Sequence, residues 1–294
     1  MNDPRPPTID PVAAARWQRR PQPASAWLHE EVARRMEQRL DWIVRQPRRW
    51  LHWEPVRGGL QAQALLAQRY PAARCEVRAL VPQEQALAAR HAQRPWWRSL
   101  KSALRPEPAS APELLWANMS LHMSADPQAL IGQWHGALAV DGFLMFSCLG
   151  PDTLRELRAL YQALGWPAPA HEYTDMHDWG DMLVSAGFAE PVMDMERIEL
   201  SFETPQRLLQ ELRELGRNLH PGRFAGLRGR GWQERLHEAL GRLAGEDGRL
   251  RLSFEIIYGH AFKPQRRLTV APETRLSLDE MRGSLRRGRG AGPG

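Results

Sequence analysis

The fold of this chain is decided by residues 112–158, which read PELLWANMSLHMSADPQALIGQWHGALAVDGFLMFSCLGPDTLRELR. An apolar run at 114–116 stops at Asn118, and a helical pattern then starts at Asp126-Pro127. A second apolar run spans 143–148 and breaks at a Gly-Pro pair. Strand, helix and strand in this order predict two parallel strands whose carboxyl ends open on a common crevice.

Several motifs in this stretch match one family. The strand ending in Ala117-Asn118, the pair Leu121-His122 and the run Asp141–Ser147 resemble the second half of class I S-adenosylmethionine (SAM)-dependent methyltransferases. The run Gly150–Arg158 is similar to the BioC-like family, the malonyl-carrier-protein O-methyltransferases of biotin synthesis. The resemblance spans most of residues 26–262 and is specific mainly in the second half of the chain.

The resemblance implies an α/β, Rossmann-like class I methyltransferase fold. Its sheet would be mostly parallel, with helices on both faces and an antiparallel hairpin at the C-terminal end. The methyltransferase-like domain would occupy residues 25–263. Residues 1–24 are rich in Pro, Ala and Arg, and residues 264–294 are rich in Arg and Gly, so both segments are predicted to lack fixed structure.

Hydrophobic spacing predicts the remaining elements. We identify no strand in residues 93–111, although the resembled fold has its third strand there. One helix would begin at Asp152-Thr153 and another would end at Gly187. Periodicity predicts helices at 26–45, 58–70, 83–92, 153–164, 177–186, 205–215 and 232–243, and strands at 50–53, 75–81, 192–202 and 251–262.

Composition argues for a soluble protein of the cytoplasm. The 294 residues contain no apolar run long enough for a membrane span and no secretory signal, so no membrane partner is predicted. Cys75 and Cys148 are the two cysteines, which indicates a reducing compartment. Most of the net charge of +6 falls in residues 264–294, where it would bind phosphate only weakly. We therefore expect no nucleic-acid partner, and we expect a monomer.

The cofactor loop departs from the resembled family. The family places SAM at the first strand–helix turn, here residues 51–59, where glycines let the backbone approach the ligand. Only Gly58 falls on a family glycine, while His52 stands at the family's acidic position. Residues 54–56 are Glu, Pro and Val in place of Gly, Cys and Gly, and Pro and Val both disfavour the usual backbone cradle.

The resemblance still implies a set of cofactor residues. The family's ribose-binding acid is missing near Ala79-Leu80; Glu84 either replaces it or stabilises the start of the next helix. Glu54 would contact the amino group of the methionine part, unless the loop is a simple turn without a ligand. The predicted SAM-binding residues are Glu54, Gly58, Asn118 and Leu121, with Asn118 alternatively a strand-end cap.

The predicted acceptor residues follow the fourth and fifth strands of the resembled fold. They are His122, Asp152, Arg155 and Arg158. An arginine would bind a malonyl carboxylate through two hydrogen bonds. The alternatives are a surface histidine, a helix cap at Asp152 and a solvated helix face for the two arginines. No catalytic residue is predicted, because an ionised carboxylate is already nucleophilic at neutral pH.

Three further features have two interpretations each. Trp17 would supply an aromatic residue that covers the cofactor. The polar cluster at 171–178 is either a helix start or a metal site, and the helix start is preferred because its spacing matches no ligand motif. Arg34, Arg35 and Arg39 form either a solvated helix face or a patch for an acidic carrier protein.

The function implied by the resemblance is SAM-dependent methylation of the free carboxylate of a malonyl thioester on acyl carrier protein, in biotin synthesis. The alternative is a catalytically silent relative that keeps the fold and acts as a binding or scaffolding module. The altered loop at 51–59 favours the alternative, whereas the strong match at 112–158 does not decide between them.

Overall fold

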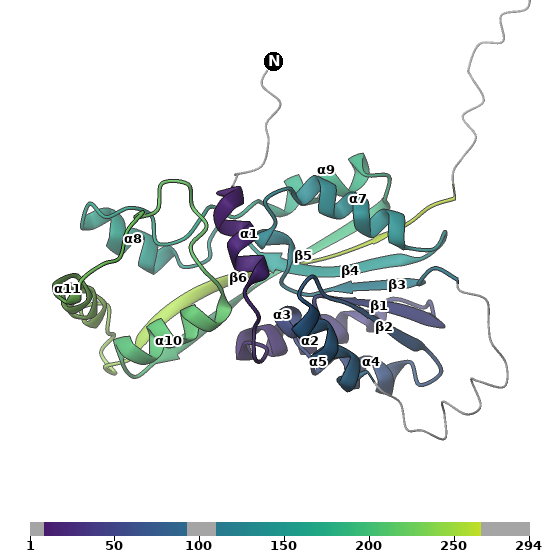
Figure 1. Cartoon of the computed structure of the whole chain (residues 1–294), viewed down its shortest axis with the longest axis horizontal. Helices are drawn as coiled ribbons and strands as arrows, with labels where there is room; N and C mark the ends of the chain where they lie inside the picture. The colour runs from purple at the N-terminus through teal and green to yellow at the C-terminus, as the bar shows by residue number, and fades with distance from the viewer. Residues whose placement is uncertain (1–8, 93–109, 266–294) are drawn as a thin grey trace, which may run out of the picture. The chain divides into compact units, whose positions relative to one another are not determined.

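A six-stranded sheet organises the chain in the computed structural model, which describes residues 9–92 and 110–265 (Figure 1). The strand order is β2-β1-β3-β4-β6-β5, in which neighbours from β2 to β4 are parallel and β6 runs antiparallel to both β4 and β5. The strands are β1 (Arg49–Trp53), β2 (Arg74–Arg78), β3 (Leu114–Ala117), β4 (Phe143–Leu149), β5 (Ala189–Phe202) and β6 (Leu250–Phe262).

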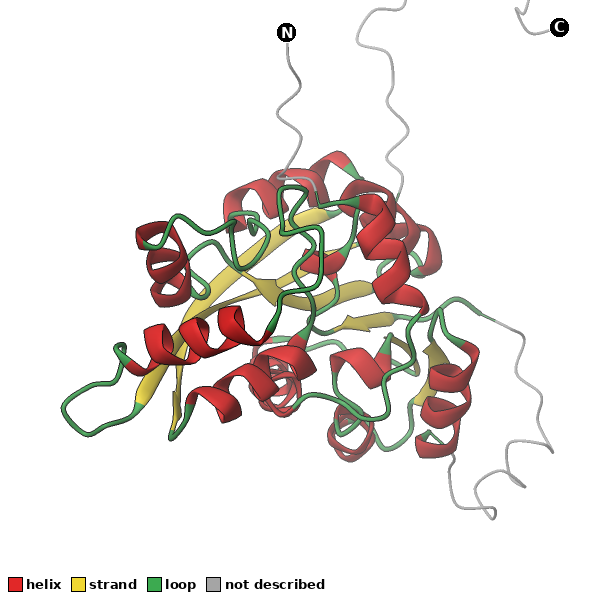
Figure 2. Cartoon of the chain, turned by 60° about the vertical axis from the view of Figure 1, so that its left-hand side comes forward, coloured by secondary structure: helices red, strands yellow, loops and turns green. Residues whose placement is uncertain are grey.

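This topology confirms the predicted fold class. The chain order reverses between β1 and β3, which creates the switch-point crevice at which doubly wound sheets bind ligands. The predicted C-terminal hairpin is the β5–β6 pair, and Figure 2 shows its long strands running beyond the parallel part of the sheet. The segment expected to hold a further strand falls mostly in 93–109, outside the described residues.

Helices cover both faces of the sheet, as predicted. In Figure 1, α7 and α9 lie on one face and α2, α4 and α5 on the other. The described helices are α1 (Pro11–Arg19), α2 (Trp27–Gln38), α3 (Pro55–Gly58), α4 (Ala62–Arg69), α5 (Pro82–His91), α7 (Pro127–Ala137), α8 (Arg155–Ala163), α9 (Met176–Ser185), α10 (Pro205–Leu215) and α11 (Arg230–Gly241), with 3₁₀ turns at Arg39–Trp42 and Leu121–Met123.

Strand alternation divides the core into two layers. Trp50 and Leu114 join the cluster that packs under α2, whereas Leu51 and Leu115 join the cluster that contains Trp134 of α7. Successive strand residues point to opposite faces, so a fully apolar strand is required wherever both faces are covered. This requirement explains the continuous apolar runs in β3 and β4. Across the described helices, none has both the length and the apolar character needed to cross a membrane.

The N-terminal segment differs from expectation. Residues 1–24 were predicted to lack fixed structure, and this is wrong for the part that forms α1. Asp10 caps the helix by accepting from Val12 N at 2.8 Å, and Pro11 occupies the first turn. Trp17 of α1 packs in a small cluster with Leu219, more than 200 residues away in sequence. The helix therefore depends on a long-range contact that local composition does not reveal.

The turn before α8 also differs from expectation. Asp152 was predicted to cap this helix, but Leu154 is the N-cap, with a left-handed φ of 59° and no side-chain cap. The Thr153 hydroxyl donates to Glu255 O at 3.2 Å and accepts from Glu255 N at 3.1 Å. Asp152 forms an ion pair with Arg197 at 2.6 Å. Both side chains attach the turn to the hairpin and leave the helix end uncapped.

Ion pairs attach α2 to the hairpin. Arg35 Nη1 lies 2.9 Å from Glu196, and Arg39 Nη2 lies 2.8 Å from Asp194. The Arg39 guanidinium also stacks on Tyr258, 3.6 Å from the ring centroid. These contacts fix the hairpin against the parallel part of the sheet.

The packing of β6 against β4 gives a test of this core. An added Cβ at Gly259 would overlap the Phe146 ring and lie 2.9 Å from Met193 Sδ. We expect Gly259→Ala to lower the free energy of unfolding by about 1–3 kcal/mol, because the core is overpacked. Gly136→Ala in α7 is the control, since its Cβ meets nothing within 4 Å; it should stabilise by about 0.5–1 kcal/mol. Urea unfolding measures both, and equal shifts would contradict this packing.

Candidate functional site

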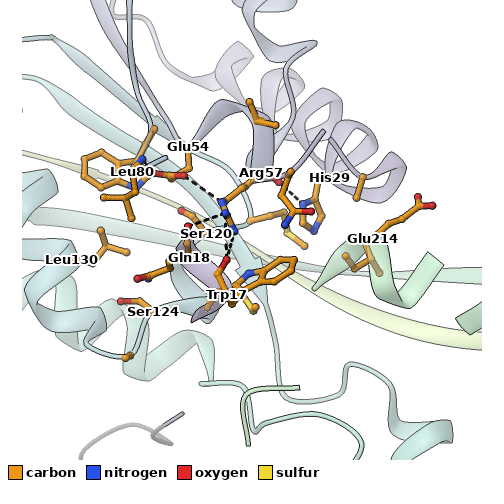
Figure 3. A pocket seen from close by; sticks show the side chains of 18 of the residues that line it. Trp17, Gln18, His29, Glu54, Arg57, Leu80, Ser120, Ser124, Leu130 and Glu214 are labelled. Carbon is orange, nitrogen blue, oxygen red and sulfur yellow. Dashed lines mark hydrogen bonds and ion pairs between the residues drawn. The ribbon is translucent and has the colours of Figure 1, made fainter. Parts of the chain in front are cut away.

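A cavity of about 390 Å³ lies at the carboxyl ends of the parallel strands (Figure 3). Its walls come from the loop after β1, the end of β2, the segment after β3 and the start of α7. Residues from α1 and α2 close another side, and Trp17 is one of the lining residues. This is the switch-point crevice that the topology predicts.

Glu54 places a carboxylate in this cavity. The residue takes a left-handed conformation, with φ of 48°, and its side chain is only 6% exposed. Its Oε1 accepts from Leu80 N at 2.7 Å, so the carboxylate lies over the end of β2. Its Oε2 has no hydrogen-bond partner among the described residues. Burial raises the pKa of Glu54 to about 7, against the opposing effects of the Leu80 hydrogen bond and the Arg57 charge.

Arg57 occupies the loop position beside it and pairs with Glu84. Arg57 Nε and Nη2 each lie 3.0 Å from a Glu84 carboxylate oxygen, which makes the pair bidentate. Glu84 also accepts from Gln22 N at 2.8 Å, and its side chain is almost fully buried. Arg57 is 3.6 Å from Glu54 Oε2, too far for a hydrogen bond. The Glu84 carboxylate is therefore held by protein groups, and Glu54 keeps an oxygen available.

The same guanidinium attaches the N-terminal segment over the cavity. Arg57 Nη2 donates to the backbone carbonyls of Gln18 at 3.1 Å and Arg20 at 2.8 Å. Its guanidinium carbon also lies 5.3 Å from the centroid of the Trp17 ring. Figure 3 shows Trp17 and Gln18 facing the cavity beside Arg57. The predicted position of Trp17 as a cover is thus matched by its place in the cavity wall.

His29 and Ser120 add further polar groups to the wall. His29 Nδ1 is 2.5 Å from the carbonyl oxygen of Arg57. Because a carbonyl only accepts, Nδ1 carries the proton and Nε2 is left as an acceptor. Burial lowers the pKa of His29 to about 4, so the ring is neutral at physiological pH. The Ser120 hydroxyl is buried and has no partner among the described residues.

Asn118 and Gly58 support the cavity from behind. Asn118 Nδ2 donates to His29 O at 2.8 Å and to Gly58 O, while its Oδ1 accepts from Ser147 Oγ at 2.5 Å. A Cβ at Gly58 would lie 2.6 Å from Asn118 O, so this glycine is required by close backbone approach. Neither residue lines the cavity, and Leu121 is a buried core residue behind it. Direct contact of these three residues with a cofactor stays a prediction.

A second cavity of about 230 Å³ adjoins the first and shares Met123 and Leu215 with it. His122, predicted as an acceptor residue, lines this cavity together with His171. His122 Nδ1 accepts from Leu149 N at 3.3 Å, and burial holds the pKa of His122 well below its usual value. His122 is therefore buried in the wall of a cavity beside the crevice and is not on the surface, and its contact with an acceptor stays a prediction.

The other three predicted acceptor residues do not line this cavity. Asp152 faces Arg197, and Arg155 lies 3.1 Å from Glu156 on its own helix. Arg158 donates to the His171 carbonyl at 2.6 Å and so positions the loop that carries His171. The structure brings none of the three to the cavity wall, and their contact with an acceptor stays a prediction.

Some site residues were not predicted. His29 and Arg57 are among them, and both depend on contacts between distant parts of the chain. The sequence did contain one signal for Arg57. It lies three residues after Glu54, in a loop that is glycine-rich in the resembled family. In the part of the chain that is described, no group of three His, Cys, Asp or Glu residues is arranged to hold a metal ion. The polar cluster at 171–178 is a helix start, in which Asp175 caps α9.

Comparison with known proteins assigns the family. The malonyl-[acyl-carrier protein] O-methyltransferase of Gallionella capsiferriformans is 38% identical over 257 residues, which cover 83% of this chain and 87% of that protein. The chain belongs to this methyltransferase family. The relative from Laribacter hongkongensis is 37% identical over 256 residues, covering 83% and 85%, and that from Halorhodospira halophila is 34% identical over 245 residues, covering 81% of each.

Two other comparisons add less. No known family model matches the chain. The solved YcgJ protein of Bacillus subtilis aligns with a TM-score of 0.48 and 11% identity, over 80% of this chain and 99% of that one. The methyltransferase fold is established by the strand order and by family membership.

The buried carboxylate in the cofactor loop of this methyltransferase predicts a pH-dependent stability change. Folding raises the pKa of Glu54 from 4.5 to about 7, so its protonated form favours the folded state. That contribution is complete below pH 4.5 and is lost as the pH rises through 7. Glu54→Gln cannot ionise and should stabilise the unliganded protein by about 1–3 kcal/mol at pH 8 and by less than about 1 kcal/mol at pH 5.

Urea unfolding at the two pH values measures this difference. The exposed Glu246→Gln is the matched control and should change stability at neither pH. An equal shift for Glu54→Gln at pH 5 and pH 8 would show that the carboxylate of Glu54 does not carry a burial cost.

Proposed function

We propose that this chain methylates the free carboxylate of a malonyl thioester on acyl carrier protein, using SAM, in the cytoplasmic synthesis of biotin. The observation that carries the proposal is the cavity at the switch point, where Glu54 presents a buried carboxylate oxygen without a hydrogen-bond partner among the described residues. The relatives over most of the chain are named malonyl-[acyl-carrier protein] O-methyltransferases, which supports the methyl transfer, the acceptor and the carrier. Nothing in these relatives favours a catalytically silent module.

The cavity fits SAM in size and in charge. Its volume of about 390 Å³ lies within the range of sites for small molecules. SAM carries a sulfonium, an amino group and a ribose diol, all of which favour acceptors or negative charge. The wall offers the Glu54 carboxylate, the His29 Nε2 acceptor and the Ser120 hydroxyl. One guanidinium, Arg57, lies between the Glu54 and Glu84 carboxylates, so these three side chains carry a net negative charge when Glu54 is ionised, which complements a cationic ligand.

Glu54 would hold the ribose hydroxyls. In the resembled family the acid that binds the ribose comes from the end of the second strand, where this chain has Ala79-Leu80. Here the Glu54 carboxylate bonds to Leu80 N and so occupies the same strand end, although it comes from the loop after β1. The expectation from sequence was a contact with the amino group; the position of the carboxylate favours the ribose, and His29 is placed for the amino group.

The remaining chemistry requires positioning and exclusion of water. When bound, SAM supplies a methyl group whose bond to sulfur breaks, leaving its electron pair on sulfur, as the acceptor oxygen bonds to carbon. An ionised carboxylate needs no general base, which agrees with neutral His29 and His122 in the cavity walls. The helix α1 covers the cavity through Trp17 and excludes water from the reacting groups.

The arginine patch expected from sequence is largely engaged within the protein. Arg34 pairs with Glu31 on its own helix, while Arg35 and Arg39 pair with acidic residues of the hairpin. Arg35 and Arg39 therefore attach the end of α2 to the hairpin, which favours the structural interpretation of this patch. The carrier protein remains part of the proposal because it appears in the names of the relatives.

Calorimetric titration of SAM into the purified chain tests the proposal. We expect saturable binding, with Glu54→Gln weakening the affinity by at least about tenfold, because it removes hydrogen bonds to a charged group. Wild-type affinity should rise as the pH increases through 7, since SAM favours the ionised carboxylate. The control, Glu246→Gln, should bind like wild type.

Mass spectrometry of malonyl-acyl carrier protein incubated with SAM should then show the methyl ester. Absence of heat at millimolar SAM, together with absence of the ester, would overturn the proposal and favour the silent module.

A further inference from the structure

The second cavity meets the first at a shared wall. Met123 and Leu215 line both cavities, so a group in the second cavity lies next to the proposed methyl donor. Most of the second cavity is apolar, with Leu157 of α8 and Phe254 of β6 among its lining residues. An acyl chain or thioester would therefore fit its interior, while any charged end would need a specific partner.

Arg217 provides that partner at the junction. It follows α10 directly and lines the second cavity. Its guanidinium carbon lies 5.3 Å from the centroid of the Trp17 ring, and Trp17 lines the first cavity. The side chain thus extends from the second cavity toward the cover of the first. Arg213 lines the second cavity as well, and of these two arginines it is Arg217 whose guanidinium lies over the Trp17 ring.

The hydrogen bonds of Arg217 leave its charge unneutralised. Its Nη1 donates to the backbone carbonyl of Gly216 at 2.7 Å and to that of Arg213. Among residues 9–92 and 110–265, no carboxylate lies within ion-pair distance of Arg217. Burial and the neighbouring charges of Arg20 and Arg213 lower its pKa, as expected for a cation that gains from an anion.

We propose that Arg217 binds the free carboxylate of the acyl acceptor and directs it toward the first cavity. This inference rests on the proposed function and adds the residue that selects the substrate class, an acyl thioester ending in a carboxylate. The planar guanidinium matches a carboxylate through two parallel hydrogen bonds. His122 and His171 line the same cavity and are neutral, because burial lowers the pKa of both, so the cation is an arginine. Of Arg213 and Arg217, which both line this cavity, Arg217 is the one that lies over Trp17 in the wall of the first cavity.

The charge also accounts for selectivity and product release. A thioester without a carboxylate would leave Arg217 partly buried and unpaired, which disfavours its binding. Conversion of the carboxylate to a methyl ester removes the negative charge that Arg217 binds. The ester is then held only by apolar contacts, and its release becomes easier.

Binding of two acyl thioesters to the full chain tests the inference. The probes are S-malonyl-pantetheine and S-acetyl-pantetheine, titrated with and without S-adenosylhomocysteine. Wild type should prefer the malonyl compound by at least about tenfold. Arg217→Gln should remove the preference. Arg217→Lys should keep part of it, since lysine retains the positive charge but cannot make two parallel hydrogen bonds to a carboxylate. The control is Arg207→Gln on α10, because Arg207 pairs with Glu211 and lines neither cavity.

The possible outcomes separate this inference from the proposed function. A wild-type chain without preference, or an Arg217→Gln variant that keeps it, overturns the role of Arg217 even if methyl transfer is found. A preference that depends on Arg217 in a chain that forms no methyl ester supports the carboxylate site and refutes the methyl transfer. In an active enzyme we expect Arg217→Gln to raise KM for the malonyl substrate at least about tenfold, with little change in the affinity for S-adenosylhomocysteine.

Discussion

The rest of the site depends on the contacts that the Arg57 guanidinium makes. It makes a bidentate pair with the buried Glu84 and donates to two carbonyls of the N-terminal segment. In a relative with a glycine-rich loop, the backbone of the loop would lie against the ligand. Pro55 and Val56 make this close approach of the backbone unfavourable in the present chain. A buried carboxylate left without its partner is strongly destabilising, so Arg57, Glu84 and α1 form one unit. In this chain side-chain contacts hold the loop after β1, in place of a glycine-rich backbone cradle.

The two cavities have opposite electrostatic character. Glu54 gives the first cavity a buried carboxylate that Arg57 approaches to 3.6 Å without a hydrogen bond, and Arg217 gives the second a cation without a bound carboxylate among the described residues. A cationic donor and an anionic acceptor would each be attracted to one side of the shared wall. In the proposed transfer both the sulfonium charge and the carboxylate charge would disappear, since the products would be a thioether and an ester.

Prediction from sequence succeeded where local signals are sufficient. The strand–helix–strand unit at 112–158 and the Asp126 cap depend on residues close in sequence, and so does the Gly187 helix end. The two strands of the C-terminal hairpin were predicted from alternation, and their antiparallel pairing from the resemblance to the family. Glu54 was identified as the acid of the first loop, and it lies in the cavity.

The missed features depend on contacts between distant residues. The helix α1 is stabilised by packing with Leu219. The carboxylate of Glu54, which follows β1, accepts a hydrogen bond from the backbone N–H of Leu80, which follows β2. The amide of Asn118 donates to the backbone carbonyls of His29 and Gly58 and accepts from the Ser147 hydroxyl, contacts that the sequence did not reveal. Arg217 follows a helix in a segment that carries no motif. No window of local sequence contains both partners of these contacts.

We propose that the Glu54 carboxylate holds the cofactor where the glycine-rich loop is absent. A crystal structure of the chain with S-adenosylhomocysteine tests this role of Glu54. We expect the ligand beneath Trp17, with its ribose hydroxyls within hydrogen-bond distance of the Glu54 carboxylate. A ligand bound with its ribose away from Glu54, or bound outside this cavity, would contradict it.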